Sequence, residues 1–282
     1  MSANLTKGER LEGGRRLVGV DPWSLERSAR VTIVTVVFND VDHVQRTIDS
    51  VASQTYRNIE HIVIDGRSRD GTLEIIQRCS SIDYWLSEAD SGIYDAMNKG
   101  VRCSEGEWIN FMNSGDVFFD ENVVANVFEK VESSSTDLVY GDVEVDYGEF
   151  KKVRSAGVVA DLKQGMQFSH QSLFAKREIL LELGLDPSYR TAADYNFIVS
   201  SWVKKYNFSR IGLVVSSVSA GGVSDVRRLE SHHQRVKILG AHLTLSTVDK
   251  LRMCLQGVYI RVADAVKSFL PGRLIDWIKK IK

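Results

Sequence analysis

The sequence predicts an α/β fold in which a mostly parallel sheet is flanked by helices. Residues 31–38 and 59–65 are runs rich in Val and Ile, as expected for strands that are buried on both faces. Each run is followed by a segment whose apolar residues recur at helical spacing. Asn39, Asp65 and Asp116 follow the carboxyl ends of predicted strands, and open parallel sheets bind their ligands at these ends.

Strand and helix signals alternate along the first part of the chain. Val44, Ile48 and Val51 indicate the first helix, and a Ser/Asp start precedes the second. Residues 137–147 alternate between apolar and polar, which predicts a strand at the sheet edge or in a small second sheet. We expect strands at 31–38, 59–65, 84–86 and from 107, and helices at 43–55, 68–80, 92–103, 123–131, 171–183 and 193–205.

Length, charge and cysteine content restrict the classes of function. A chain of 282 residues can bury the core of one large domain, and a net charge of -1 gives no general attraction to nucleic acid. Three widely spaced cysteines favour a reducing cytosolic setting. The first 30 residues lack an apolar export signal, and no apolar run is long enough to span a membrane. We therefore expect a cytoplasmic protein with a leader (1–30), a continuous body (31–224) and a helical C-terminal region (225–282).

Three short segments together carry a family resemblance. They are VVFND at the first strand end, VIDGRSRDGT at the second, and SEADSGIYDAMNKG followed by WINFMNSGD. In these segments the chain resembles the family 2 glycosyltransferases of the GT-A fold, and within them the bacterial surface-polysaccharide (colanic acid type) enzymes. The resemblance is specific over residues 31–119 and weaker to about 224. It implies an inverting glycosyltransferase of polysaccharide biosynthesis that uses a UDP- or GDP-type sugar donor and a saccharide or lipid-linked saccharide acceptor.

The resemblance also implies where the donor binds. Asn39 and Asp65 correspond to positions that contact the base or ribose, and carboxylates accept hydrogen bonds from such groups. The segment from Ser91 to Gly100 corresponds to one that lies across the donor sugar and diphosphate, which gives four more candidates: Asp90, Asp95, Asn98 and Lys99. Two simpler interpretations stay open, namely that Asp65 makes a turn and that Lys99 is a solvated helix residue.

The segment MNSGD stands where the family carries its acidic metal-binding motif. Only Asp116 is acidic here, because Asn113, Ser114 and Gly115 occupy the other positions. One carboxylate, two diphosphate oxygens and water can still hold Mn²⁺ or Mg²⁺, since magnesium needs few protein ligands. We therefore expect Asp116 to bind a divalent cation; the alternative is that it caps a turn.

The resemblance places the catalytic base downstream, in the segment TAADYNFIVSSW. Asp194 occupies the second acidic position there, while Ala193 replaces the first acid. Asp194 could also cap the following helix, and Asp161 is a weaker alternative base. The segment FSHQSLF resembles the acceptor side of the family, so His170 and Gln171 are expected to contact the acceptor or the donor phosphate. A histidine in this position could equally be structural.

The last 33 residues are basic and amphipathic. Residues 250–282 contain eight Lys or Arg and two Asp among many large apolar residues. A helix pair broken at Pro271-Gly272, with Trp277 near lipid headgroups, would suit peripheral contact with the inner face of the cytoplasmic membrane. Packing on the domain and contact between two copies explain the same pattern.

Other functions and a mobile element were also weighed. A catalytically inactive nucleotide-sugar-binding regulator or scaffold is compatible with the reduced acidic motif. A sugar-nucleotide synthesising nucleotidyltransferase is disfavoured, because no glycine-rich basic loop follows the first strand.

The segment SAGGVS at 219–224 resembles a flexible family segment, so its paired glycines are expected to form a lid or a tight turn.

Overall fold

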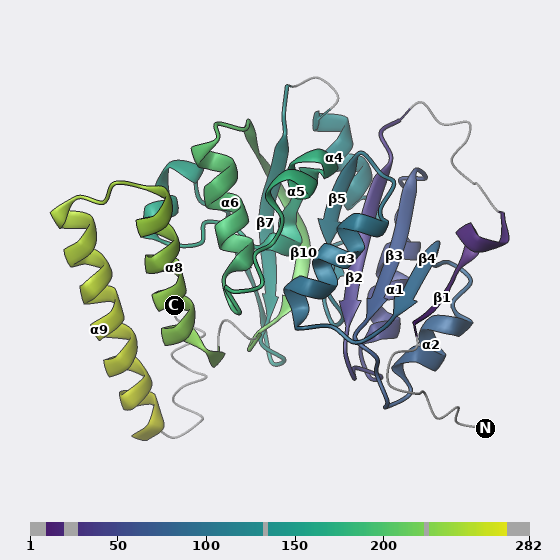
Figure 1. Cartoon of the computed structure of the whole chain (residues 1–282), viewed down its shortest axis with the longest axis horizontal. Helices are drawn as coiled ribbons and strands as arrows, with labels where there is room; N and C mark the ends of the chain where they lie inside the picture. The colour runs from purple at the N-terminus through teal and green to yellow at the C-terminus, as the bar shows by residue number, and fades with distance from the viewer. Residues whose placement is uncertain (1–9, 20–27, 132–134, 223–225, 270–282) are drawn as a thin grey trace.

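A computed structural model describes residues 10–19, 28–131, 135–222 and 226–269. They form a mixed α/β fold with one sheet, which confirms the predicted fold class. Figure 1 shows the sheet with β1 (Leu11–Gly13) toward one end of the molecule and α9 (Thr247–Phe269) at the other. The strand order is β1-β4-β3-β2-β5-β9-β7-β10-β6, and β8 pairs with β7 outside this path.

Four strands form the parallel half of the sheet that positions the candidate site. They are β2 (Val31–Val37), β3 (Ile59–Asp65), β4 (Tyr84–Ser87) and β5 (Trp108–Phe111). The crossovers between them are α1 (Val44–Ala52), α2 (Thr72–Arg78) and α3 (Ile93–Cys103), as predicted. In the register, Val37 pairs with Asp65 and Asp65 pairs with Ser87, so these carboxyl ends stand in one line.

Strand β2 is buried on both faces, which explains its uninterrupted apolar sequence. Val34 and Val36 share a core cluster with residues of α3, α5 (Arg177–Leu183) and α6 (Ala193–Val203). Val31 and Ile33 pack on the opposite face with residues of α4 (Val123–Val131). Helix α3 approaches β2 so closely that a Cβ on Gly100 would lie 2.3 Å from a methyl group of Val34.

The second half of the sheet differs from two predictions. Residues 137–147 were expected at an edge or in a second sheet, but β7 (Leu138–Asp146) lies inside the single sheet, between β9 and β10. A helix expected at 171–183 begins only at Arg177, because residues 173–176 form β9, which pairs antiparallel with both β5 and β7. The remaining strands are β6 (Val117–Phe118), β8 (Lys151–Arg154) and β10 (Phe208–Ser219), and 3-10 turns occupy Val159–Gln164 and His170–Ser172.

The segment before the body adds to the same sheet. Strand β1 pairs antiparallel with β4, and the 3-10 turn Arg15–Val18 follows it. Arg15 donates to Asp83 (Nη2–Oδ1 2.6 Å), and Arg16 donates to Glu60 (Nη1–Oε1 2.9 Å). Both carboxylates are buried, so two strands of the parallel half depend on charges supplied from this segment.

Two helices complete the described chain. Helix α8 (Arg228–His242) packs on α6, and α9 packs on α8. No helix among the described residues is long and apolar enough to cross a membrane. The predicted break at Pro271-Gly272 and Trp277 lie outside the described residues. Of the segment 219–224, the first four residues are described, and they contain the end of β10 and Gly221 at a φ of 93°. The last two residues of this segment lie outside the described residues.

We expect Arg16→Ala to lower the free energy of unfolding by about 3 kcal/mol, because it leaves the Glu60 carboxylate buried without its cation. Lys204→Ala is the matched control: its pair with Glu182 is exposed on both sides, and exposed pairs contribute below about 1 kcal/mol. Urea unfolding of the three proteins measures both effects. Equal losses in the two variants would contradict the structural role of the segment.

Candidate active site

The loops after β2 and β3 are joined through Asn39. This residue has a φ of 48°, in the left-handed region that Asn tolerates better than most residues. Its N-H donates to Ser68 Oγ (2.7 Å), and its side-chain oxygen accepts from the N-H of Arg69 (2.8 Å). The two strand ends therefore form one rigid rim.

Asp65 organises the same rim from inside. It is buried, and one carboxylate oxygen accepts from Ser68 Oγ while the other accepts from Ser87 Oγ (2.6 Å). The side chain thus connects the ends of β3 and β4. The two serine hydroxyls use part of the acceptor capacity of this carboxylate, which has about four lone-pair sites.

Asp90 lies against the backbone of Gly66. A Cβ on Gly66 would lie 2.5 Å from Asp90 Oδ2 and 3.2 Å from the ring of Phe38, so only glycine leaves room there. Burial raises the pKa of Asp90, although Gly92 N-H donates to it (2.9 Å). Phe38 is 62% exposed, and we had not singled it out from the sequence. The feature of the sequence that could have identified Phe38 is that a large aromatic residue directly follows a buried strand.

The three other residues predicted to bind the nucleotide-sugar donor lie on α3, and each has hydrogen-bond partners within the chain. Asp95 accepts from Ser91 N-H (3.0 Å) in the first helical turn. Asn98 donates to Leu185 O (2.7 Å) and accepts from Leu185 N-H (3.0 Å). Lys99 reaches Ala89 O (2.7 Å) and pairs with Glu88 (2.9 Å). These contacts hold the loop before α3 and the loop after α5 in place.

The MNSGD loop is fixed to α1 and presents Asp116. Thr47 Oγ1 donates to Asp116 O (2.8 Å) and accepts from Gly115 N-H (3.0 Å). Asp116 Oδ2 accepts from Gln171 Nε2 (2.7 Å), and burial raises the pKa of the Asp116 carboxyl. Ser114 Oγ donates to Asp40 Oδ2 (2.6 Å), which brings to this loop a second carboxylate that the sequence had not singled out.

The loop suits a cation that arrives with a ligand. Among the described residues, no group of three or more His, Cys, Asp or Glu is placed to hold a metal. The Asp116 carboxylate and the carbonyl oxygen of Asn113 are hard oxygen donors, and Asn113 Oδ1 is buried with no partner in the described chain. The residues therefore fit a divalent ion that brings further oxygen ligands with it.

Asp194 lies at the start of α6 and is enclosed by donors. His170 Nδ1 is 3.1 Å from its Oδ2, while Tyr94 Oη (3.1 Å) and Tyr195 N-H (2.8 Å) donate to its Oδ1. Only 14% of the side chain is exposed. Burial alone would raise the pKa of Asp194, but the hydrogen bond and charge of His170, with the other donors, hold it below its ordinary value.

His170 connects Asp194 with the MNSGD loop. Its Nε2 is 3.1 Å from Asn113 Nδ2, and its Nδ1 faces Asp194. The neighbouring Gln171 holds Asp116, so one short turn contacts both predicted key acids. Tyr94 and Asn113 belong to this cluster and were missed as site residues. Asp161, the weaker candidate, lies on another turn and accepts from Gln164 (2.7 Å).

Comparison with known proteins identifies relatives of the chain. Residues 32–185 match the model of the family described as Glycosyl transferase family 2. An uncharacterized glycosyltransferase of Mycobacterium tuberculosis is 46% identical over 101 residues, which are 35% of this chain and 38% of that protein. The chain thus spans about two fifths of that relative. A PGL/p-HBAD biosynthesis glycosyltransferase of Mycobacterium bovis is 31% identical over 189 residues, covering 63% of this chain and 72% of that protein.

Solved structures share the fold. A mannosyltransferase from Pyrobaculum calidifontis in complex with GDP-Man and Mn²⁺ superposes with a TM-score of 0.61 at 15% identity, covering 93% of this chain and 83% of that chain. TarS of Staphylococcus aureus in complex with UDP gives a TM-score of 0.60 at 12% identity, covering 79% and 69%. At these identities the likeness establishes the GT-A fold alone.

We expect His170→Ala to raise the pKa of Asp194 relative to the wild type, because burial then acts without the hydrogen bond and charge of His170. In the wild type a depressed folded-state pKa stabilises the fold above the unfolded pKa, and this stability is lost as pH falls through the folded pKa. In the variant this contribution is smaller, so less stability is lost over the same fall in pH. Carboxyl-carbon NMR titration measures the shift, with Asp194→Asn identifying the signal. An unchanged titration would contradict the assigned contact.

Proposed function

The chain belongs to glycosyl transferase family 2, and we propose that it transfers a sugar, with inversion, from a nucleotide-diphosphate donor to an acceptor hydroxyl. The observation that carries this proposal is the turn His170–Ser172, which connects the candidate base with the candidate cation ligand. His170 contacts Asp194, and Gln171 contacts Asp116. Inverting transfer needs these two functions on opposite sides of the reacting carbon, one for the incoming hydroxyl and one for the leaving diphosphate.

Asp194 is proposed as the general base. A depressed pKa keeps its carboxylate ionised at neutral pH, so it is ready to accept the acceptor hydroxyl proton. As the O–H bond breaks, the hydroxyl oxygen attacks the anomeric carbon and the bond to the nucleotide diphosphate breaks. His170 and Tyr94 act as positioning residues, because their hydrogen bonds fix the orientation of the carboxylate.

The rim at the ends of β2, β3 and β4 is proposed to hold the nucleotide. Exposed Phe38 offers a ring face to a base, and Asn39, Asp65 and Asp90 supply acceptors around it. Asp95, Asn98 and Lys99 are proposed to shape the segment that lies across the donor sugar and diphosphate. Their contacts with Ser91, Leu185 and Ala89 support this role, since they fix that segment to α3.

Asp116 is proposed to hold Mn²⁺ or Mg²⁺ together with the donor diphosphate. When bound, the ion neutralises negative charge that develops on the leaving group. The chain contributes one carboxylate, held in place by Gln171 and by the bonds from Thr47 to the loop. Solved neighbours carrying Mn²⁺ with GDP-Man or UDP support a divalent cation in this fold.

The acceptor is proposed to be a saccharide or a lipid-linked saccharide of polysaccharide biosynthesis. A PGL/p-HBAD biosynthesis glycosyltransferase among the relatives supports a glycan product. We place the reaction in the cytoplasm, with peripheral contact at the inner face of the membrane. Contact of His170 with both Asn113 and Asp194 supports a role for it at the acceptor or the donor phosphate.

A panel of UDP-, GDP- and dTDP-sugars, assayed for hydrolysis and transfer with Mn²⁺ or Mg²⁺, tests the proposal. We expect turnover with one donor class, dependent on the cation. Asp194→Asn should lower kcat by about 10²- to 10⁴-fold while donor binding persists, because only proton transfer is lost. Asp116→Asn should weaken the cation dependence and donor binding together.

The outcomes separate the leading function from its alternative. Asp161→Asn is the matched control, and it should keep wild-type kcat because Asp161 has no contact with Asp194 among its described hydrogen bonds. Donor binding without turnover, even with lipid-linked acceptors, would favour a nucleotide-sugar-binding regulator or scaffold. If no donor binds, the proposed function is wrong.

We expect Gly66→Ala to raise the donor KM about tenfold, since the new methyl group displaces Asp90 and presses on Phe38. Both neighbours are side chains that can move, so the fold should survive with little change in melting temperature. Gly240→Ala, on α8 with no atom within 4 Å of the added Cβ and no left-handed φ, controls for general effects of the substitution. Steady-state kinetics with varied donor measures KM, and an unchanged KM would place the donor elsewhere.

A further inference from the structure

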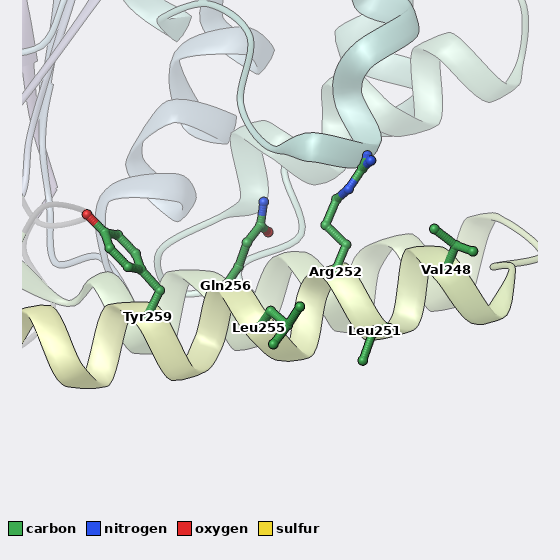
Figure 2. Close-up of a pocket in the computed structure, with 6 residues that line it drawn as sticks. All are labelled: Val248, Leu251, Arg252, Leu255, Gln256 and Tyr259. Atoms are coloured by element: carbon green, nitrogen blue, oxygen red, sulfur yellow. The ribbon is translucent and has the colours of Figure 1, made fainter.

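Helix α9 presents an apolar stripe to its surroundings. Its members are each at least 50% exposed and recur at intervals of three or four residues: Val248, Leu251, Leu255, Val258, Val262 and Val266. This spacing places them on one side of an α-helix. Figure 2 shows Leu251 directed away from the rest of the chain, while Arg252 and Gln256 extend toward it.

The opposite side of α9 is already packed. Met253 and Ile260 are buried at 5% and 7% exposure, and Met253 O is 3.0 Å from the His232 Nε2 of α8. Gln256 Nε2 also donates to Gln164 O (3.5 Å). At about 100° per residue, the stripe lies on the far side of the helix from these contacts. It is therefore not needed for attachment of α9 to the body.

Charge beside the stripe is positive. Lys250 and Arg261 are exposed beside the stripe, and Arg252 is exposed on the flank that faces the body. The acids of the same helix are held by other partners: Asp249 accepts from Ser246 Oγ (2.8 Å), and Asp264 pairs with Arg228 (3.1 Å). An apolar stripe with basic flanks matches an anionic lipid surface, where the apolar side chains insert and the cations meet headgroups.

We propose that α9 lies in the plane of an anionic membrane surface and binds it through this stripe. The proposal gives a residue-level surface to the membrane contact suggested above, and it rests on the geometry of α9 rather than on the transferase reaction. A second copy of the chain fits less well, because any two-fold contact of the stripe brings basic flanks against basic flanks. The segment 270–282 is also basic, with four Lys or Arg and one Asp, so it shares the preference for anionic lipid.

The surface is connected to the proposed base through α8. Gln234 of α8 accepts from Thr191 N-H (3.0 Å), three residues before Asp194, and α9 packs on α8. Docking of α9 thus fixes the height of the base-bearing helix above the lipid. This arrangement suits an acceptor whose reactive hydroxyl is held at a membrane surface.

Vesicle flotation of the full-length chain tests the proposal. We expect flotation with vesicles of equal parts phosphatidylcholine and phosphatidylglycerol, and much weaker flotation with phosphatidylcholine alone. Replacing Lys250 or Arg261 by Gln should each lower the partition coefficient about fivefold. Leu251→Glu with Leu255→Glu should lower it at least about tenfold, since two inserted side chains are lost.

Leu181→Glu with Val153→Glu is the matched control, because it adds the same charge at exposed apolar positions of α5 and β8. It should float like the wild type, as should Asp194→Asn, so failed catalysis and failed binding are distinguishable. Wild-type flotation by the stripe double variant would overturn the proposal. So would loss of flotation only on removal of 270–282, or sedimentation showing a dimer that the stripe variant dissociates while vesicle binding is unchanged.

Discussion

The in-line pairing of β4, β3 and β2 is the constraint on which the site depends. Because these strands are parallel and in register, Val37, Asp65 and Ser87 end side by side. Their following loops then meet at one edge, where the Ser68 and Ser87 hydroxyls donate to the Asp65 carboxylate and the Asn39 N-H donates to Ser68. A buried carboxylate with two hydroxyl donors is stable only in that geometry, so the rim and the sheet stabilise each other.

Much of the fold was predictable because the signal is local. The apolar pattern of a buried strand or an amphipathic crossover helix is contained in consecutive residues. For this reason the ends of β2, β3, α1 and α4 were predicted to within a few residues. Strand β9 was missed because four residues, Leu173–Lys176, gain their strand conformation from two antiparallel neighbours. Likewise, the residues around Arg15 and Arg16 do not predict that these arginines pair with buried Asp83 and Glu60, which lie far away in sequence.

The site shows the same division between local and distant information. Family resemblance picked out Asp116, His170, Gln171 and Asp194 individually, yet only the fold shows that one short turn contacts both acids. Tyr94 was not predicted as a site residue, and it lies 100 positions from Asp194, to which its hydroxyl donates. For Asn98 and Lys99 the resemblance predicted ligand contacts, whereas the structure shows that their side chains bond the backbone of neighbouring loops.

Two partly buried carboxylates of the site are driven in opposite directions by their surroundings. Around Asp194 the chain supplies three hydrogen-bond donors and the charge of His170, and together they outweigh burial and keep the group ionised. At Asp116 burial outweighs Gln171 and the more distant charges of His170 and Arg46, so the pKa is raised. A cation bound beside Asp116 would lower this pKa again, because it favours the charged carboxylate. This asymmetry matches the two proposed roles: Asp194 as a base whose donors all come from the protein, and Asp116 as a ligand of a cation that would accompany the sugar donor.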